Sequence, residues 1–226
     1  MSGPRQLSLD FDIRPAFGGA DFLVAACNRD AVAWIDQWPG WQTPVLTVHG
    51  PASCGKSHLA EVFRRASRAQ VLNHAQLAAD EPRDPAAASG AWIVEDADRY
   101  LTVAAPAPLF HLFNQVREGG GTLLLTGRAA PARWHVDLAD LRSRLNAGAA
   151  VAIGEPDDGL LAAVLIKLFA DRQLRVGTDV IDYALRRMVR QFSAAHDLVA
   201  AVDAVALAER REITVPLLRR VLDPGR

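Results

Sequence analysis

The stretch GPASCGKS at residues 50–57 strongly limits what this chain can fold into, because it fits the pattern G-x-x-x-x-G-K-S. The apolar run VLTVH precedes it, and a helical pattern follows it. This order predicts a strand, a phosphate-binding loop (P-loop) and a helix, with backbone N–H groups directed at phosphate oxygens. We expect Lys56 to reach the β- and γ-phosphates and Ser57 to bind Mg²⁺. The candidate nucleotide-binding residues of the loop are Gly50, Ser53, Cys54, Gly55, Lys56, Ser57 and His58.

Apolar runs alternate with helix-like segments in the first part of the chain. The runs lie at residues 45–50, 70–74, 91–96, 122–127 and 150–154. They predict an α/β fold with a parallel five-stranded sheet. After residue 154 four helical patterns begin near Asp, Thr or Ser, which predicts a small all-α lid subdomain. We therefore expect a tail at residues 1–12, a nucleotide-binding α/β core at 13–154 and a helical lid at 155–226, with a loop at 78–90.

The composition argues against several classes of protein. With 25 basic and 26 acidic residues, the formal charge of −1 offers no overall attraction to nucleic acid or to an anionic membrane. Cys27 and Cys54 provide neither a disulfide framework nor metal-ligand spacing. The sequence has no apparent signal peptide and no apolar stretch of the ~20 residues that a membrane span requires. We expect a reduced, cytoplasmic protein that contacts DNA only indirectly.

Three further polar residues end the apolar runs. Glu95 and Asp96 close AWIVED, where a P-loop protein needs carboxylates for Mg²⁺ and for the attacking water. The alternative is that they are solvent-facing residues that open a loop. Thr126 ends the fourth run, where its hydroxyl would reach the γ-phosphate or the water. Cys54 is either a thiol activated by the helix N-terminus or a small residue that the loop tolerates.

The P-loop, WIVEDAD, LLLTGR, LRSRL and the helical lid together resemble the AAA+ ATPases, and in particular the replication initiator DnaA, over residues 13–222. The resemblance implies bound ADP or ATP with Mg²⁺, and places Leu23 and Val24 against the adenine. It also matches Arg144 of LRSRL to the arginine finger, which would act on the ATP of a neighbouring protein. The alternative is a helix-surface arginine paired with Asp137 or Asp140.

Two positions depart from the DnaA pattern. His196 stands where DnaA has the sensor 2 arginine, and a neutral imidazole does not replace a permanent bidentate cation. The alternative for His196 is a partly buried polar residue. Glu95 stands where DnaA has an aspartate. We therefore expect the chain to be at most a weak ATPase, which holds its nucleotide as a structural ligand.

The N-terminal stretch QLSLDF resembles the peptide by which DnaA-related regulators of the Hda type bind the β sliding clamp of DNA polymerase III. We expect Gln6, Leu7, Leu9 and Phe11 to bind the clamp, although the same alternation fits an edge strand. DnaA carries a DNA-binding domain after its lid, and we expect none here. The resemblance implies a regulator that stimulates hydrolysis of DnaA-bound ATP and prevents over-initiation, with DnaA and the clamp as partners; it also allows a homo-oligomer.

Two other functions fit the same residues. One is an autonomous AAA+ ATPase, such as a clamp-loader-like or remodelling subunit. The other is an adaptor with a vestigial P-loop. Trp34, Trp38 and Trp41 are either core residues or a partner-binding patch. The basic clusters at residues 64–68 and 186–190 are explained by solvated helix faces.

Overall fold

The computed structural model describes residues 13–15, 21–79 and 89–223. Residues 6–11, which contain the predicted clamp peptide, lie outside this part. The chain divides into two compact units, and the main boundary falls between Gly154 and Glu155. The α/β unit comprises Pro15–Phe22 and Ala26–Gly154, whereas Leu23–Ala25 group with the helical unit. A short two-stranded sheet is formed by β1 (Ile13–Pro15) and β2 (Asp21–Leu23).

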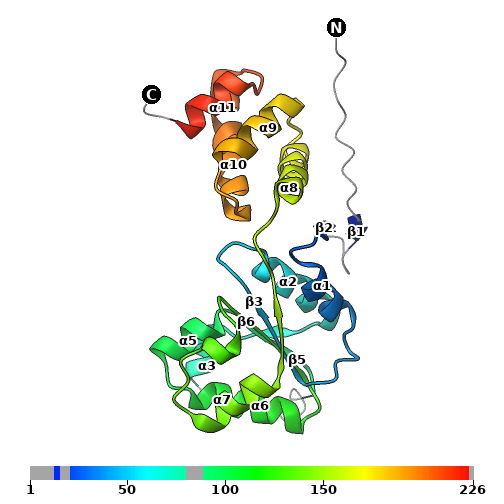
Figure 1. Cartoon of the computed structure of the whole chain (residues 1–226), viewed down its shortest axis with the longest axis vertical. Helices are drawn as coiled ribbons and strands as arrows, with labels where there is room; N and C mark the ends of the chain where they lie inside the picture. Colours follow the sequence, from blue (N-terminus) through cyan, green and yellow to red (C-terminus); the bar gives the residue numbers. More distant parts are fainter. Residues whose placement is uncertain (1–12, 16–20, 80–88, 224–226) are drawn as a thin grey trace. The chain divides into compact units, whose positions relative to one another are not determined.

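The α/β unit is built on a parallel five-stranded sheet, as the alternation of apolar runs predicts (Figure 1). The strand order is β4-β5-β6-β3-β7, and every neighbouring pair is parallel. The strands are β3 (Val45–His49), β4 (Gln70–Val71), β5 (Ala91–Val94), β6 (Thr122–Gly127) and β7 (Ala149–Ala152). Because all strands run the same way, the loops that follow β3, β5 and β6 meet at one edge of the sheet.

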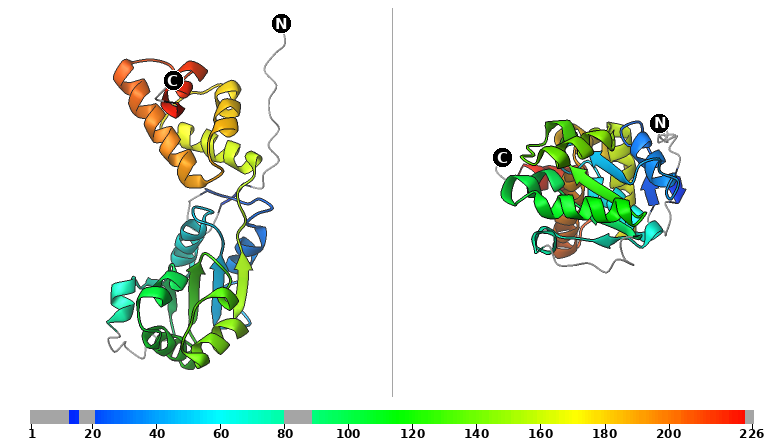
Figure 2. Two further views of the ribbon diagram at one scale, coloured as in Figure 1. Left: turned by 60° about the vertical axis from the view of Figure 1, so that its left-hand side comes forward. Right: turned by 90° about the horizontal axis from the view of Figure 1, so that it is seen from below.

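Helices cover both faces of this sheet (Figure 2). Side chains alternate between the faces, so Leu123 and Leu125 of β6 point one way and Leu124 points the other. The first face packs against α3 (His74–Ala78), α5 (Ala97–Val103), α6 (Ala107–Glu118) and α7 (Ala139–Ala147). The helices α1 (Arg29–Asp36) and α2 (Lys56–Ser67) cover the second. Both faces are therefore buried, which explains why the strands are almost continuously apolar.

Two helices of the first face, α3 and α5, were not predicted by the sequence pattern. They are five and seven residues long. A helix of one or two turns has too few residues to show an apolar period. The start of α3 is nevertheless encoded, because the side chain of Asn73 accepts from Gln76 N at 2.9 Å and that of Gln76 accepts from Asn73 N at 3.0 Å.

The helical unit contains the four predicted helices. These are α8 (Asp158–Asp171), α9 (Thr178–Arg187), α10 (Phe192–Glu209) and α11 (Val215–Leu222). The carboxylate of Asp157 caps α8 by accepting from Leu160 N at 2.7 Å. Apolar side chains from all four helices form one core. No helix in the described part of the chain combines the length and the apolar character needed to cross a membrane.

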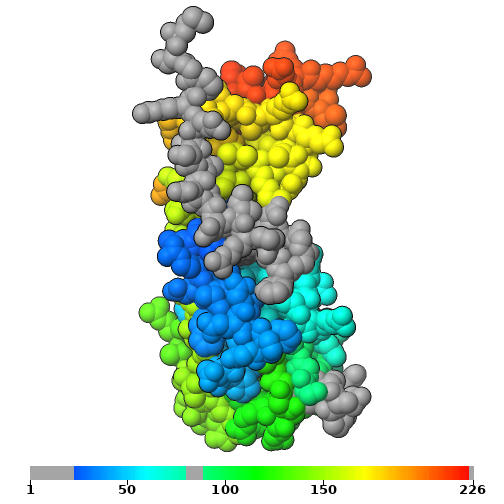
Figure 3. Space-filling model, turned by 90° about the vertical axis from the view of Figure 1, so that its right-hand side faces the viewer, coloured from blue at the N-terminus to red at the C-terminus, as the bar shows by residue number. Residues whose placement is uncertain are grey.

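The tryptophans near α1 belong to the packing of the α/β unit. Trp41 stacks on Phe63 with ring centroids 5.1 Å apart, and Trp38 meets the same ring edge-on at 5.9 Å. The indole N–H of Trp38 donates to Thr122 Oγ1 at 3.2 Å, and that of Trp41 donates to Trp34 O at 2.7 Å. In Figure 3 the surface of α1, in blue, adjoins that of α2, in cyan. These contacts support the core interpretation of the tryptophans.

Candidate nucleotide-binding site

The loop between β3 and α2 has the backbone that a phosphate-binding loop requires. Gly50 N donates to Gly127 O at 3.2 Å, which ties the start of the loop to the end of β6. A Cβ on Gly50 would lie 2.1 Å from Ile153 O, so no other residue fits there without a shift. Ser53 and Gly55 have φ of 55° and 103°, so the chain turns sharply before α2 begins at Lys56.

Lys56 is folded back onto this loop. Its Nζ donates to Gly50 O at 2.9 Å and to Pro51 O at 2.7 Å, and only 8% of the residue is exposed. The first turn of α2 contains no acidic residue. A buried cation at the positive end of a helix, with no carboxylate to offset it, is the environment that an anionic ligand stabilises. The loop residues therefore fit the phosphates of a nucleotide.

Cys54 belongs to the loop, and its side chain is buried, with 2% of the residue exposed. Burial raises the pKa of its thiol, and the nearby Lys56 offsets this effect only in part. A buried thiol with a raised pKa is a poor nucleophile, so the structure favours the small tolerated residue over the reactive thiol. Ser57 and His58 follow on the exposed side of α2. Burial also lowers the pKa of His49 at the end of β3, and Arg133 and Lys56 add to this effect.

Glu95 and Asp96 lie directly after β5, at the same edge of the sheet as the P-loop. Both are half-buried, and Asp96 adopts left-handed backbone angles (φ 50°, ψ 43°) where α5 begins. They form the turn between β5 and α5, so their role at Mg²⁺ stays a prediction. Among the described residues no group of three or more His, Cys, Asp or Glu side chains is arranged to hold a metal ion. This pair alone would leave most Mg²⁺ ligands to water and phosphate.

Thr126 occupies the predicted position on β6 between the P-loop strand and β5, and it is 1% exposed. Its Oγ1 accepts a hydrogen bond from Asp96 N at 3.0 Å. The hydroxyl therefore fixes the turn that carries the two carboxylates. This role was not predicted, since it depends on the left-handed conformation of Asp96.

Two residues that the sequence reasoning missed hold the same turn. His74 Nε2 lies 2.9 Å from Glu95 O, and its ring packs against Tyr100 with centroids 5.5 Å apart. Asp98 Oδ2 accepts from Arg128 N at 2.7 Å, which joins α5 to the residue after β6. The sequence EDAD contained the signal for Asp98, because a carboxylate in the first turn of a helix is a common N-terminal feature. Nothing in the sequence indicated His74.

Arg144 lies on α7 one helical turn after Asp140, yet no ion pair joins it to Asp140 or Asp137 among the described residues. Asp137 lies near His135 instead, with Oδ1 and Nε2 3.3 Å apart. Within the described residues Arg144 forms no ion pair, and its Nη1 is buried without a hydrogen-bond acceptor. Its Cζ lies 4.7 Å from the centroid of the Phe110 ring. The alternative of a surface ion pair with Asp137 or Asp140 is therefore wrong.

The remaining predicted site residues belong to the helical unit. His196 lies near the start of α10 and is exposed, so the interpretation as a partly buried polar residue is wrong. Leu23 and Val24 are half-buried and group with the helical unit rather than with the P-loop. Their roles at the adenine stay predictions.

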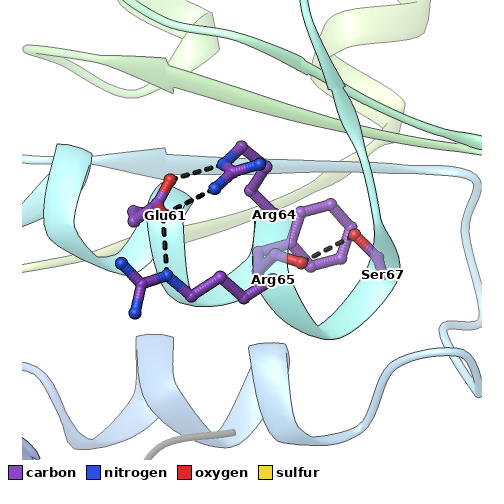
Figure 4. A network of polar contacts seen from close by, with 5 residues as sticks. Glu61, Arg64, Arg65 and Ser67 are labelled. Carbon is purple, nitrogen blue, oxygen red and sulfur yellow. Dashed lines mark hydrogen bonds and ion pairs between the residues drawn. The ribbon is translucent and has the colours of Figure 1, made fainter. Parts of the chain in front are cut away.

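Two arginines of the basic cluster on α2 pair with a carboxylate of the same helix. Glu61 accepts from Arg64 Nε at 2.6 Å and from Arg65 Nε at 2.7 Å (Figure 4). The hydrogen bond from Arg64 is the largest cause of a fall in the pKa of Glu61 to about 2. Arg190 in the second cluster forms a two-pronged pair with Asp158 at 2.8 and 2.9 Å. Arg64, Arg65 and Arg190 are therefore paired with carboxylates rather than free.

Comparison with known proteins adds two findings. Residues 158–222 match the family model described as the lid domain of Hda. An uncharacterised protein of Haemophilus influenzae is 26% identical over 116 residues, which are 51% of this chain and 50% of that protein. The chain thus matches about half the length of this curated relative.

Solved structures of DnaA share the fold. Domain III of the Thermotoga maritima replication initiation protein DnaA has a TM-score of 0.74 at 13% identity, covering 90% of this chain and 94% of that one. AMPPCP-bound DnaA from Aquifex aeolicus has a TM-score of 0.66 at 16% identity, covering 88% of this chain and 70% of that one.

The parallel sheet of this strand order, the P-loop after its central strand and the helical lid define an AAA+ fold. The α/β sheet and lid thus have the fold of DnaA domain III, and the lid matches the Hda lid family over residues 158–222.

Proposed function

We propose that this chain is a cytoplasmic, nucleotide-binding regulator of chromosome replication that stimulates hydrolysis of DnaA-bound ATP and prevents over-initiation. The observation that carries the proposal is the half-buried Arg144, whose Nη1 has no hydrogen-bond acceptor among the described residues. A cation that no described carboxylate neutralises is available to a phosphate. The match of residues 158–222 to the lid of Hda supports the same function.

The chain would hold ADP or ATP of its own at the P-loop. Lys56 would exchange the carbonyls of Gly50 and Pro51 for phosphate oxygens, since both kinds of acceptor suit an ammonium group. Ser57 would bind Mg²⁺ with Glu95 and Asp96. The Aquifex aeolicus DnaA structure contains AMPPCP, which supports a nucleotide at this fold.

Arg144 would act on the nucleotide of DnaA rather than on that of its own chain. Guanidinium donors stabilise the charge that spreads over phosphoryl oxygens in the transition state. In GTPase systems a supplied arginine is worth ~10³ to 10⁵ in rate. The chain itself would be at most a weak ATPase, because His196 offers no permanent cation.

The peptide at residues 6–11 would bring the protein to replicating DNA by binding the β sliding clamp. Leu9 and Phe11 would enter an apolar pocket, and the Gln6 amide would form hydrogen bonds. Contact with DNA is then indirect, in agreement with the net charge of −1. Changing Leu9 and Phe11 to Ala should abolish clamp binding without lowering the melting temperature. A large fall in melting temperature would instead identify these residues as core.

The proposal is tested by the release of phosphate from DnaA–ATP with clamp loaded on DNA. We expect the purified chain to accelerate hydrolysis, and Arg144→Ala to abolish the acceleration while clamp binding is unchanged. Arg142→Ala is the matched control, because Arg142 is exposed on the same helix and its Nη1 reaches only Val136 O at 3.5 Å. Equal activity of the Arg144→Ala variant and the native chain would overturn the proposal.

The second candidate function is an autonomous AAA+ ATPase. The adjacent carboxylates of Glu95 and Asp96 at the P-loop edge of the sheet favour it, because they are the groups that hydrolysis in cis requires. The two functions differ in a simple assay. An autonomous ATPase turns over ATP at a rate that DnaA does not change, and Glu95→Gln abolishes this turnover.

A further inference from the structure

Arg144 is held by aromatic rings rather than by an anion. Its Cζ lies 4.7 Å from the centroid of the Phe110 ring and 5.9 Å from that of Phe113. Both phenylalanines belong to α6, whereas Arg144 belongs to α7. All three residues are in the α/β unit. The packing of these two helices therefore sets the position of the guanidinium.

An aromatic support and an ion pair have different consequences for an arginine. A carboxylate would fix the guanidinium but would also neutralise it and take its N–H donors. A ring face attracts the cation through its quadrupole and leaves the donors in the guanidinium plane unused. Arg144 is half-buried, and its inner Nη1 has no acceptor within hydrogen-bond distance in the described part of the chain, so the rings rather than a hydrogen bond hold this side of the guanidinium.

The two rings contribute unequally to this arrangement. Phe113 is 5% exposed and belongs to the core beneath α6, so its ring is fixed by many neighbours. Phe110 is half-buried at the margin of that core and lies closer to Arg144. Phe110 is therefore the residue whose ring can change without loss of the core.

We infer that Phe110 is a positioning residue for Arg144: its ring orients the guanidinium for an anion outside the chain without neutralising its charge. The inference rests on the proposed function in so far as that anion is the γ-phosphate of DnaA-bound ATP. The contact between Phe110 and Arg144 can be tested without DnaA. The two parts of the experiment therefore separate the inference from the proposed function.

The first part is nuclear magnetic resonance of the full chain. A ring face shifts the resonances of nearby side-chain protons upfield, so we expect the δ-protons of Arg144 to be shifted in the native protein. The spectrum of Arg144→Lys identifies these signals. Phe110→Leu should move them to ordinary positions, whereas Phe110→Tyr should retain the shift. Phe192→Leu, which removes another half-buried ring from α10, should leave them unchanged.

The second part is the hydrolysis of DnaA–ATP in the presence of loaded clamp. We expect Phe110→Leu to lower the stimulation about tenfold, and Phe110→Tyr to restore it, with clamp binding and melting temperature close to native. A residue that only fills apolar space would tolerate leucine, so a loss in Phe110→Leu that Phe110→Tyr does not show identifies the ring face as the feature that matters. Phe192→Leu again serves as the control for loss of apolar area.

The outcomes are distinct. An inactive Arg144→Ala together with a fully active Phe110→Leu would overturn the inference and leave the proposed function standing. A fully active Arg144→Ala would overturn the proposed function. The proton shifts would still report whether Phe110 holds Arg144, and unchanged shifts in Phe110→Leu would overturn the inference on their own.

Discussion

The hydroxyl of Thr126 accepts a hydrogen bond from the backbone N–H of Asp96 over 3.0 Å. Thr126 lies on β6 and Asp96 follows the neighbouring strand β5, so this bond connects the turn after β5 to β6. The position of Glu95 and Asp96 relative to the P-loop therefore depends on a buried threonine. A valine at this position has the same shape but lacks the acceptor.

Thr126→Val should destabilise the protein by about 1 kcal/mol, because Asp96 N loses its partner while the apolar packing is retained. The free energy of unfolding in guanidinium chloride measures this effect. Thr126→Ser keeps the hydroxyl and serves as the comparison. If the valine variant is as stable as the native chain, the bond does not hold the turn.

Gly50→Ala should remove nucleotide binding, because the new Cβ would lie 2.1 Å from Ile153 O and force the loop to shift. Forced shifts of this kind cost about 1–3 kcal/mol. Gly120→Ala is the control, since its Cβ would meet no atom within 4 Å and its φ of 70° costs roughly 1–2 kcal/mol. Titration with a fluorescent ADP analogue should show binding to the Gly120 variant only.

Lys56→Met should weaken nucleotide binding by about 10- to 100-fold, which corresponds to the loss of one charge-assisted hydrogen bond. The two lysines of the sequence are Lys56 and Lys167. Lys167→Met provides a matched control, because Lys167 is paired with Asp171 at 3.4 Å on the surface of α8. Equal affinity of the two variants would contradict the assignment of Lys56 to the phosphates. Calorimetric titration with ADP gives both values.

Glu61→Gln should alter the dependence of stability on pH. The pKa of Glu61 falls from 4.5 to about 2 in the folded protein, chiefly through the hydrogen bond from Arg64. A pKa lowered by folding gives a contribution that is complete above about pH 5 and disappears as pH falls toward 2. The melting temperature difference between native and variant should therefore be constant near neutrality and shrink below pH 4.5. Added salt should reduce this melting-temperature difference, because it screens the charges.

Glu118→Gln removes one carboxylate from the exposed end of α6 and is the control for this experiment. Melting curves of both variants between pH 2 and 7 give the comparison. If the melting temperatures of the Glu61 and Glu118 variants differ from that of the native chain in the same way at every pH, the cluster around Glu61 does not contribute to stability.

The sequence predicted the sheet and the four lid helices well, because apolar runs and helical patterns leave strong periodic signals. The second strand was predicted at residues 70–74, but β4 ends at Val71 because Asn73 caps α3. Within the site, the position of Thr126 was predicted and its partner was not. That partner depends on the left-handed backbone of Asp96, which no residue pattern specifies.

Arg144 shows the same limit of prediction from sequence. Its helix and its type of chemistry could be derived from LRSRL, and its neighbour Phe110 could not. The distance between them depends on how α6 and α7 pack on the sheet, which involves residues far apart in sequence. Local patterns predict which residues are polar at a strand end, while contacts between elements decide what those residues touch.

The order of strands in the sheet also determines when the P-loop can form during synthesis. The strand that leads into it, β3, pairs only with β6 and β7, which are made much later. Gly50 N in turn donates a hydrogen bond to Gly127 O, and Gly50 lies close to Ile153 O. Pairing over such separations is slow, because a long loop must close before any contact compensates for the lost entropy. A nascent chain that has not yet exposed β7 at the ribosome therefore lacks a formed P-loop.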